Sequence, residues 1–262
     1  MDLMLRNKVA IVTGASKGIG MAVTEALADE GALVVGAARR ISSLQGMENV
    51  APVATDLLEF DAPAELIKRT LDMHGRIDIL VNNLGTARLR PKGFLAVSDE
   101  DFRWSLEHNL FSMVRASRAA LRAMGEQNCG AVVNVTAGDF GALPSSSTID
   151  FHAAKAAVAS ITKSLAGEFF PQGIRINGVS PGPVSTDLWL GEGGLVEALG
   201  AARGLNGHPL HESLAARVEG SSSSQFVHPE EVATMVTYLA SPRSAPVTGI
   251  IFPIDGNFKQ RL

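Results

Sequence analysis

Short, almost wholly apolar runs alternate with longer segments of helical periodicity along most of the chain. Runs of this length and composition are typical of strands that are buried on both faces of a parallel sheet. The runs are Val9–Thr13, Leu33–Ala37, Ile77–Asn82, Ala131–Val135 and Ile174–Val179. Near the C-terminus, "GIIFPID" predicts a last strand. Pro253 within it predicts a place at the edge of the sheet, because proline cannot donate to a ladder of hydrogen bonds.

The intervening segments carry the signals of helices. Ile19–Glu30 is followed by Gly31, a residue typical of the position just past a helix. A longer segment, Phe151–Phe169, has an apolar stripe and ends before Pro171. The alternation predicts a doubly wound α/β fold of Rossmann type, with a parallel sheet of about seven strands and helices on both faces. The chain has 262 residues and no internal repeat, so we expect a single domain over residues 1–262.

One region, about residues 187–227, breaks the alternation. It contains "GEGG", "GLNGHP" and "SSSSQ" with helical pieces between them, and the serine run favours local flexibility. A long irregular insert in a compact domain is usually a functional lid or a disordered loop. The apolar residues of this insert favour a lid over a mostly apolar organic substrate; they are Leu188, Trp189, Leu190, Leu195 and Leu199.

Composition, net charge and cysteine count exclude several classes of protein. Hydrophobic residues make up 46% of the chain, and the net charge of −4 argues against broad nucleic-acid binding, which needs clustered positive charge. Cys129 is the single cysteine, so an internal disulfide is excluded. The sequence shows neither the apolar core of a signal peptide nor a run long enough to span a membrane. We therefore expect a cytoplasmic protein that binds neither nucleic acid nor membrane.

The first predicted strand leads into "TGASKGIG", Thr13–Gly20, with glycines at Gly14, Gly18 and Gly20. A tight turn that opens a helix presents free N–H groups and the positive end of the helix dipole, which suit a pyrophosphate. Glycines also let the backbone approach the phosphates closely. Such a triplet, placed after a first strand, favours a dinucleotide site over a purely structural turn.

The end of the second predicted strand bears on the choice of cofactor. It reads "GAARRIS" and carries Arg39 and Arg40 with no acid nearby. An unphosphorylated adenosine ribose calls for a carboxylate at this place, and a 2′-phosphate calls for a cation. Lys17 in the glycine turn adds positive charge. We therefore expect NADP(H) rather than NAD(H); the alternative is that both arginines are ordinary solvated charges.

With these motifs in place, the chain resembles the short-chain dehydrogenases/reductases over nearly its whole length. "TGASKGIG" resembles the family's TGxxxGxG, "NNLG" resembles NNAG, and "INGVSPGPVST" resembles the segment that lies against the nicotinamide. "TDLL" places Asp56 where the family contacts adenine. The resemblance implies cofactor contacts from Gly14, Ser16, Lys17, Gly18, Ile19, Gly20, Arg39, Asp56, Leu57, Asn83, Gly85, Lys155, Pro181, Gly182, Val184 and Thr186.

The family's catalytic group is Asn, Ser, Tyr and Lys, and the resemblance carries over Asn109 and Lys155. In the family, the lysine orients the nicotinamide ribose and lowers the pKa of the tyrosine, while the asparagine holds a water in a proton relay. The tyrosine position holds Phe151, which has no proton to give. Counting back from this position puts the serine at Gly138, and counting on from the preceding strand puts it at Ala137. Neither has a hydroxyl.

Other side chains are candidates for the missing proton donor. Asp139 would serve if its loop bulges toward the nicotinamide, because a carboxyl in an apolar pocket has a raised pKa; the alternative is a loop aspartate bonded to its own backbone. His152 is rotated by about 100° from the tyrosine position, so we expect it to point away. Asp150 is interpreted as an N-cap or first-turn acid. His208 and His211 lie in the lid, either near substrate or simply solvated.

The sequence thus predicts an NADP(H)-dependent oxidoreductase that acts on a carbonyl or alcohol of a mostly apolar small molecule, with an atypical proton route and no metal. Two alternatives stay open: a nucleotide-binding protein of this fold with little redox activity, serving as a sensor or partner subunit, and a non-redox lyase or isomerase. Family members commonly associate through the helices that here hold Asn109 and Phe151. We therefore expect a homodimer or homotetramer.

Overall fold

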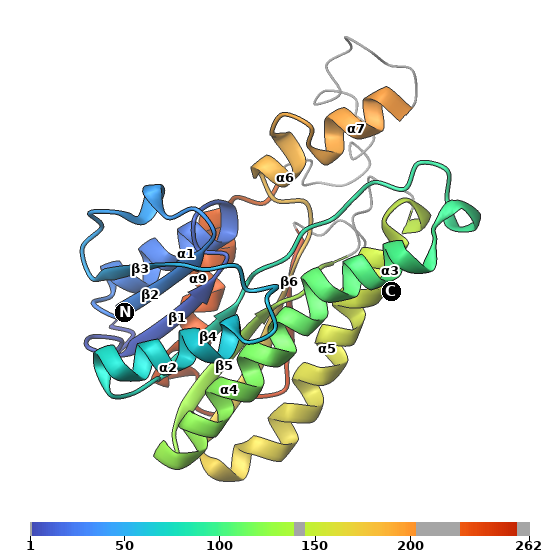
Figure 1. The fold of residues 1–262 in the computed structure, drawn as a ribbon. Coiled ribbons are helices and arrows are strands. Elements are labelled where there is room, and N and C mark those ends of the chain that lie inside the picture. Colours follow the sequence, from blue (N-terminus) through green and yellow to red (C-terminus); the bar gives the residue numbers. More distant parts are fainter. Residues whose placement is uncertain (1, 139–144, 203–225, 256–262) are drawn as a thin grey trace.

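The computed structural model describes residues 2–138, 145–202 and 226–255. Its centre is one seven-stranded sheet in the order β3-β2-β1-β4-β5-β6-β7 (Figure 1). Every neighbouring pair is parallel. The strands are β1 Val9–Thr13, β2 Leu33–Ala38, β3 Val50–Ala54, β4 Ile79–Asn82, β5 Gly130–Val135, β6 Ile174–Pro181 and β7 Ile251–Ile254. The expected fold class is confirmed.

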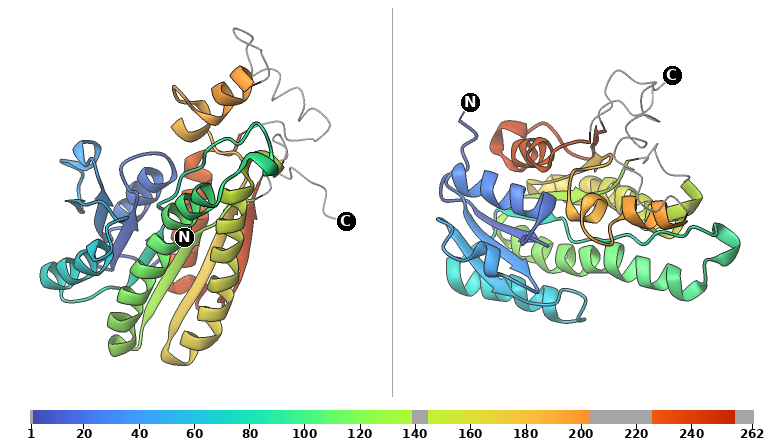
Figure 2. Two further views of the ribbon diagram at one scale, coloured as in Figure 1. Left: turned by 45° about the vertical axis from the view of Figure 1, so that its right-hand side comes forward. Right: turned by 90° about the horizontal axis from the view of Figure 1, so that it is seen from above.

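Helices cover both faces of this sheet (Figures 1 and 2). They are α1 Gly18–Asp29, α2 Ala62–His74, α3 Asp99–Leu106, α4 Ser112–Gln127, α5 Ile149–Phe169, α6 Asp187–Leu190, α7 Leu195–Ala202 and α9 Pro229–Ala240. The sheet has a hydrophobic core on each face, and side chains along β1 alternate between the two. Ala10 and Val12 pack toward α1 and α9, and Ile11 packs toward α2 and α4. Among the described helices, none is long and apolar enough to cross a membrane.

The predicted strands and helices are confirmed with shifts of a few residues at their ends. One strand, β3, was not recognised as a strand from the sequence. It reads "VAPVA", lies at one edge of the sheet and is only partly buried, so its residues do not form the continuous apolar run of a central strand. At the other edge, β7 contains Pro253 and pairs only with β6, as predicted.

The strand order reverses between β1 and β4, which are neighbours in the sheet but not in the sequence. The connections from these two strands therefore leave to opposite sides and open a crevice at their carboxyl ends. In doubly wound sheets this is the place where ligands bind.

The turn after β1 is packed very tightly at this crevice. Gly14 and Gly18 have φ values of +66° and +55°, a region that favours glycine. Gly20 has a different constraint: a Cβ there would lie 2.1 Å from the Gly14 oxygen and 2.5 Å from Nδ2 of Asn83. Gly20 is thus needed so that α1 can begin directly against the turn and the segment after β4.

We expect Gly20→Ala to lower the free energy of unfolding by about 3 kcal/mol, because the added methyl meets backbone that cannot move aside. Chemical denaturation measures this change. Gly167→Ala in α5 is the matched control, since a Cβ there has nothing within 4 Å. The control should stabilise the protein by up to about 1 kcal/mol, from helix propensity. Equal stability of Gly20→Ala and the parent would contradict the packing argument.

Candidate active site

A cavity of about 880 Å³ opens at the carboxyl ends of the strands. Its walls come from the turn after β1, the ends of β2 and β3, and the segments after β4, β5 and β6. The expected cofactor residues lie along it: Gly14, Ser16, Lys17, Gly18, Ile19, Arg39, Asp56, Leu57, Asn83, Gly85, Lys155, Pro181, Gly182, Val184 and Thr186. Gly20 is the exception, since it lies buried beneath Gly14 and Asn83. Residues spread over most of the chain therefore meet in one cavity.

The turn after β1 is joined to the segment after β4 by a set of hydrogen bonds. The hydroxyl oxygen of Thr13 accepts from the backbone N–H groups of Asn83 (3.0 Å) and Leu84 (3.1 Å). The side-chain amide of Asn83 donates back to the carbonyls of Thr13 (2.9 Å) and Gly14 (3.2 Å). These bonds hold the two walls of the crevice at a constant separation.

The N-terminus of α1 faces this cavity without a side-chain cap. Its first-turn N–H groups are therefore available to an anion, and the helix dipole favours negative charge there. A Cβ at Gly14 or Gly18 would lie 3.1 Å from Asn83 or Thr186, so the glycines keep the turn open. The turn fits the pyrophosphate of a dinucleotide.

The far corner of the cavity, at the ends of β2 and β3, is basic. Arg39 and Arg40 are exposed there beside Asp56, whose carboxylate accepts the backbone N–H of Leu58 at 3.2 Å. Lys17 lies elsewhere: its ammonium is 3.6 Å from Asp187 of α6. The arginines are thus the cations of this corner, and Lys17 is directed toward the insert at 187–227.

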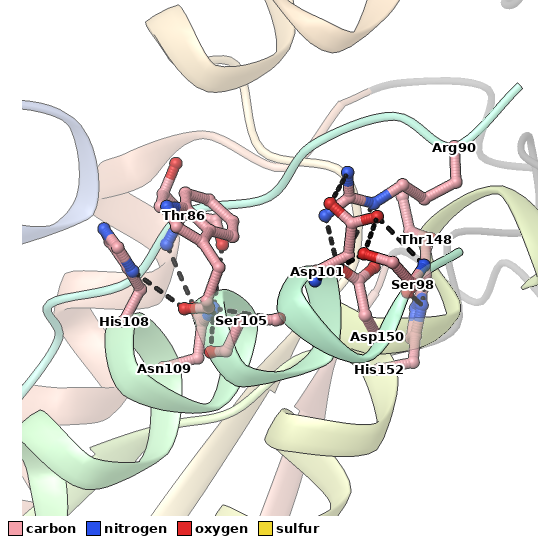
Figure 3. Close-up of polar contacts among 11 residues, drawn as sticks. Thr86, Arg90, Ser98, Asp101, Ser105, His108, Asn109, Thr148, Asp150 and His152 are labelled. Carbon is pink, nitrogen blue, oxygen red and sulfur yellow. Dashed lines mark hydrogen bonds and ion pairs between the residues drawn. The ribbon is translucent and has the colours of Figure 1, made fainter. Parts of the chain in front are cut away.

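Asn109 lies in a π-helical turn, Glu107–Phe111, between α3 and α4. Its side chain is buried and bonded to backbone: Nδ2 donates to the carbonyls of Thr86 and Ser105, both at 2.9 Å, and Oδ1 accepts the Thr86 N–H at 3.0 Å (Figure 3). Through these hydrogen bonds, Asn109 holds the segment after β4 against the π-helical turn. π-Helical turns of this kind are frequent at functional sites.

Lys155 also lies close to Gly85, beside Asn109. A Cβ at Gly85 would lie 2.8 Å from Oδ1 of Asn109 and 3.0 Å from Nζ of Lys155. The Lys155 ammonium donates to the carbonyl of Val135 at 2.8 Å. Burial away from water lowers the pKa of Lys155 to about 8.

The two positions that lack a hydroxyl lie at the same end of the cavity. The Nζ atom of Lys155 is 5.9 Å from the centre of the Phe151 ring. Of the two candidates for the serine position, Ala137 lines the cavity and packs with Phe151. Gly138 is instead bonded through its N–H to Pro181 (2.7 Å). Nearby, Thr136 has a hydroxyl, but it donates to the Val179 carbonyl at 2.9 Å.

Phe151 belongs to a small apolar cluster formed partly by the insert at 187–227. Phe151, Trp189, Leu195 and Val196 are its buried members, and Ala87, Leu89, Ala137, Leu188 and Phe226 pack around them. Of the apolar lid residues expected from the sequence, Leu190 is instead 37% exposed, and nothing is described of the Leu199 side chain. The cofactor end of the cavity is thus basic and glycine-rich, whereas the opposite end is apolar.

A buried ion pair holds the segment after β4 against α5. Arg90 donates to Asp150 from Nη2 (2.7 Å) and Nε (3.2 Å), while its Nη1 lies 2.8 Å from Asp101 in α3 (Figure 3). The Arg90 N–H also donates to the Ser147 carbonyl at 2.7 Å. Asp150 is in the first turn of α5, as expected, but its main contact is this arginine rather than a cap. The pair connects three segments beside Phe151.

Of the other proposed replacements for the proton donor, His152 is the one that the structure describes. His152 bonds through Nδ1 to the carbonyl of Thr148 at 3.0 Å and is not part of the cavity wall, in line with its expected rotation. Asp139, His208 and His211 lie outside the described residues. In the parts of the chain that are described, no group of three or more His, Cys, Asp or Glu residues is arranged to hold a metal ion.

Three residues of the cavity wall were not anticipated from the sequence. Arg88 stacks over Trp104, 3.9 Å from the ring centre, and the rings of Trp104 and His108 have centres 4.2 Å apart. His108 donates through Nδ1 to the Trp104 carbonyl at 2.8 Å. The i, i+4 spacing of Trp104 and His108, directly before Asn109, is the signal that points to a shared face.

The switch-point crevice, uncapped helix and glycine turn are those of a doubly wound dinucleotide-binding protein. A family model described as Enoyl-(Acyl carrier protein) reductase matches residues 14–258. The chain is 33% identical over 257 residues to 3-oxoacyl-(acyl-carrier-protein) reductase FabG of Vibrio cholerae, covering 96% of this chain and 97% of that protein. The chain belongs to the short-chain dehydrogenase/reductase family of oxidoreductases.

Two further relatives show the breadth of this family. Cis-4-hydroxycyclohexanecarboxylate dehydrogenase of Sinomonas cyclohexanicum is 35% identical over 264 residues, covering 96% of each chain. The ligand-free structure of aldohexose dehydrogenase from Thermoplasma acidophilum superposes with a TM-score of 0.84 at 27% identity, covering 98% of this chain and 96% of that one. The names of these two relatives give chemically different substrates, a hydroxycyclohexanecarboxylate and an aldohexose.

We expect Asp150→Asn to lower the free energy of unfolding by about 2 kcal/mol, because Arg90 loses the charge of its buried partner and keeps only the ion pair with Asp101. Asp99→Asn is the matched control. Asp99 pairs with Arg103 at the surface of α3, where both side chains are mostly exposed, so its loss should barely change stability. Urea denaturation of both variants measures the difference, and equal effects would contradict a structural role for the buried pair.

Proposed function

We propose that this protein is an NADP(H)-dependent oxidoreductase that interconverts a carbonyl and an alcohol on a mostly apolar small molecule. The observation that carries the proposal is a single cavity with Arg39 and Arg40 at one end and Lys155 beside an apolar cluster at the other. When bound, the reduced nicotinamide supplies the hydride that the carbonyl carbon accepts. The names of the relatives, a ketone reductase and two alcohol dehydrogenases, support this reaction class.

The chain's own residues have distinct tasks in this proposal. The first-turn N–H groups of α1 bind the pyrophosphate, and Arg39 binds the 2′-phosphate through a charge-assisted hydrogen bond. Lys155 binds the nicotinamide ribose, and Asn109 holds the wall that carries Gly85. The apolar cluster around Phe151 excludes water from the reacting carbonyl, which strengthens the electrostatic interactions there.

A second candidate is favoured by the missing hydroxyls at Phe151 and Ala137. A protein that binds NADP(H) as a sensor or partner subunit needs the basic corner and the glycine turn but no proton donor. The buried Lys155 favours the catalytic function. Burying an ammonium group at the end of the cavity costs free energy, and a protein that only binds NADP(H) has less need of such a group. NADPH consumption with a panel of ketones, aldehydes and quinones separates the two. Tight NADPH binding without turnover would favour the second candidate.

For the assembly we propose a homodimer or homotetramer that associates through α4 and α5. A groove of about 580 Å³ runs between these helices. Its apolar residues are Val114, Leu121, Ile161, Leu165 and Phe169. A second copy of the same pair of helices would cover this groove. With a single, unpaired cysteine, Cys129, the protein suits the reducing cytoplasm, where we place it.

Arg39→Asp should weaken NADPH binding by roughly 10- to 100-fold, the range of a hydrogen bond between charged groups, and leave NADH binding within a few-fold. Fluorescence or calorimetric titration of both cofactors measures this. Arg69→Asp is the charge-matched control, since Arg69 is exposed on α2 and lies outside the cavity wall. An equal loss for the two cofactors would mean that Arg39 does not read the 2′-phosphate.

Phe151→Tyr should raise kcat/KM for carbonyl reduction by about 10²- to 10⁴-fold, the usual contribution of a general acid. The new phenol would lie beside the Lys155 ammonium, a neighbour that favours the phenolate and lowers the phenol pKa. Ala137→Ser should help only in combination with it, as expected for groups that act as a unit. Steady-state assays with the best substrate of the panel measure both effects.

Phe170→Tyr, which adds the same hydroxyl to a half-exposed ring at the far end of α5, is the control and should leave the rate unchanged. If Phe151→Tyr binds NADPH normally but is no faster than the parent, the site was rebuilt for other chemistry.

A further inference from the structure

The end of the cavity where a substrate carbonyl would react offers few groups that can give up a proton. Around Phe151 and Lys155, the cavity wall includes Val135, Thr136, Ala137, Pro181, Gly182 and Val184. Among these described residues, Lys155 is the only ionisable one. The Thr136 hydroxyl has a very high intrinsic pKa, and its proton is directed to Val179. The Lys155 ammonium is therefore the acidic group of this wall.

The position of Lys155 suits proton transfer into the cavity. Its Nζ is held by one hydrogen bond, to the Val135 carbonyl at 2.8 Å, and lies 5.9 Å from the centre of the Phe151 ring. Within the described chain, this is the one acceptor of the ammonium group, so two N–H bonds remain to be directed at a ligand or a water. The Phe151 ring ends without an oxygen, so this side chain offers the ammonium no phenol as a hydrogen-bond acceptor.

The charges around Lys155 leave its proton labile. On its own helix, Asp150 faces Arg90 and His152 faces Thr148. From the neighbouring elements, Asp187 of α6 pairs with Lys17, and His108 bonds the Trp104 carbonyl.

No carboxylate of the described residues therefore holds the ammonium in its charged form, and burial lowers its pKa to about 8. A group that titrates near working pH can both give and regain a proton.

We propose that Lys155 is the general acid of this enzyme, delivering a proton from Nζ to the reacting oxygen directly or through one water, in place of the phenol that Phe151 lacks. The inference rests on the carbonyl reduction proposed above. As the carbonyl carbon gains a hydride, one N–H bond of Lys155 breaks and one O–H bond forms on the substrate. Lys155 is left as a neutral amine, which recovers its proton from solvent before the next turnover.

The sign of the pH dependence follows from this role. A general acid must be protonated, so kcat/KM for reduction should be constant at low pH and fall as the pH rises through about 8. The Lys155 ammonium can be observed without turnover by NMR of protein labelled with ¹³C at the lysine ε position. Lys155→Arg identifies the signal by its loss. We expect the signal to titrate near pH 8, well below the ordinary pKa of a solvated lysine.

A double-mutant cycle separates proton donation from positioning. Arginine keeps the charge beside the ribose but does not release a proton, so Lys155→Arg should leave the NADPH Kd within a few-fold and lower kcat by about 10²- to 10⁴-fold. When Phe151→Tyr is also present, the phenol supplies the proton, and the same lysine change should cost less than about 10-fold. Lys163→Arg is the control and should be neutral in both backgrounds.

The outcomes distinguish the inference from the function on which it rests. A parent protein that binds NADPH but reduces no member of the panel would overturn both. A parent that reduces a ketone, together with an equal cost of Lys155→Arg in the two backgrounds, would overturn the inference alone, because Lys155 would then only position the cofactor. A Lys155 signal that titrates at the ordinary pKa of a solvated lysine would also overturn it.

Discussion

The close approach of the turn after β1 to the segment after β4 is the constraint on which the cavity depends. The two segments are joined by hydrogen bonds from Asn83 to the carbonyls of Thr13 and Gly14, and from backbone N–H groups to the Thr13 hydroxyl. The absence of a Cβ at Gly20 makes this distance possible. Because the same segment after β4 continues past Gly85 to Arg90, the arrangement of the crevice also sets the wall beside Lys155.

Two further sets of contacts hold the cavity wall near Lys155 and Phe151. Asn109 bonds both backbone groups of Thr86, and Arg90 is held by Asp101 and Asp150. Neither set of contacts involves the side chain of Phe151 or Ala137. The lack of a hydroxyl at these two positions therefore does not disturb the contacts that hold the wall. At this end of the cavity, Phe151 packs with apolar residues of the insert at 187–227, and Lys155 is a desolvated charge. The contacts that hold the cavity wall and the side chains that lack a hydroxyl are thus separate parts of one cavity.

Much of the fold and of the cofactor end follows from local rules. Apolar runs mark buried strands because both faces of the sheet are covered, and the glycine turn marks a helix start that a phosphate can approach. The edge strand β3 was not predicted in this way, because its residues are only partly buried and a proline interrupts its apolar run. The sequence also did not predict that Arg88, Trp104 and His108 stack in the cavity wall, because they belong to no motif of the cofactor site.

The sequence by itself determined the doubly wound class, the glycine turn, the basic corner and the absence of both hydroxyls, because each depends on residue type or on neighbours in the chain. Only the tertiary structure placed Ala137 in the cavity wall beside Phe151, directed Lys17 to Asp187, and paired Asp150 with Arg90. These facts depend on which distant segments meet. The same holds for the proton affinity of Lys155, which is set by burial, and burial is a property of the assembled fold rather than of any short stretch of sequence.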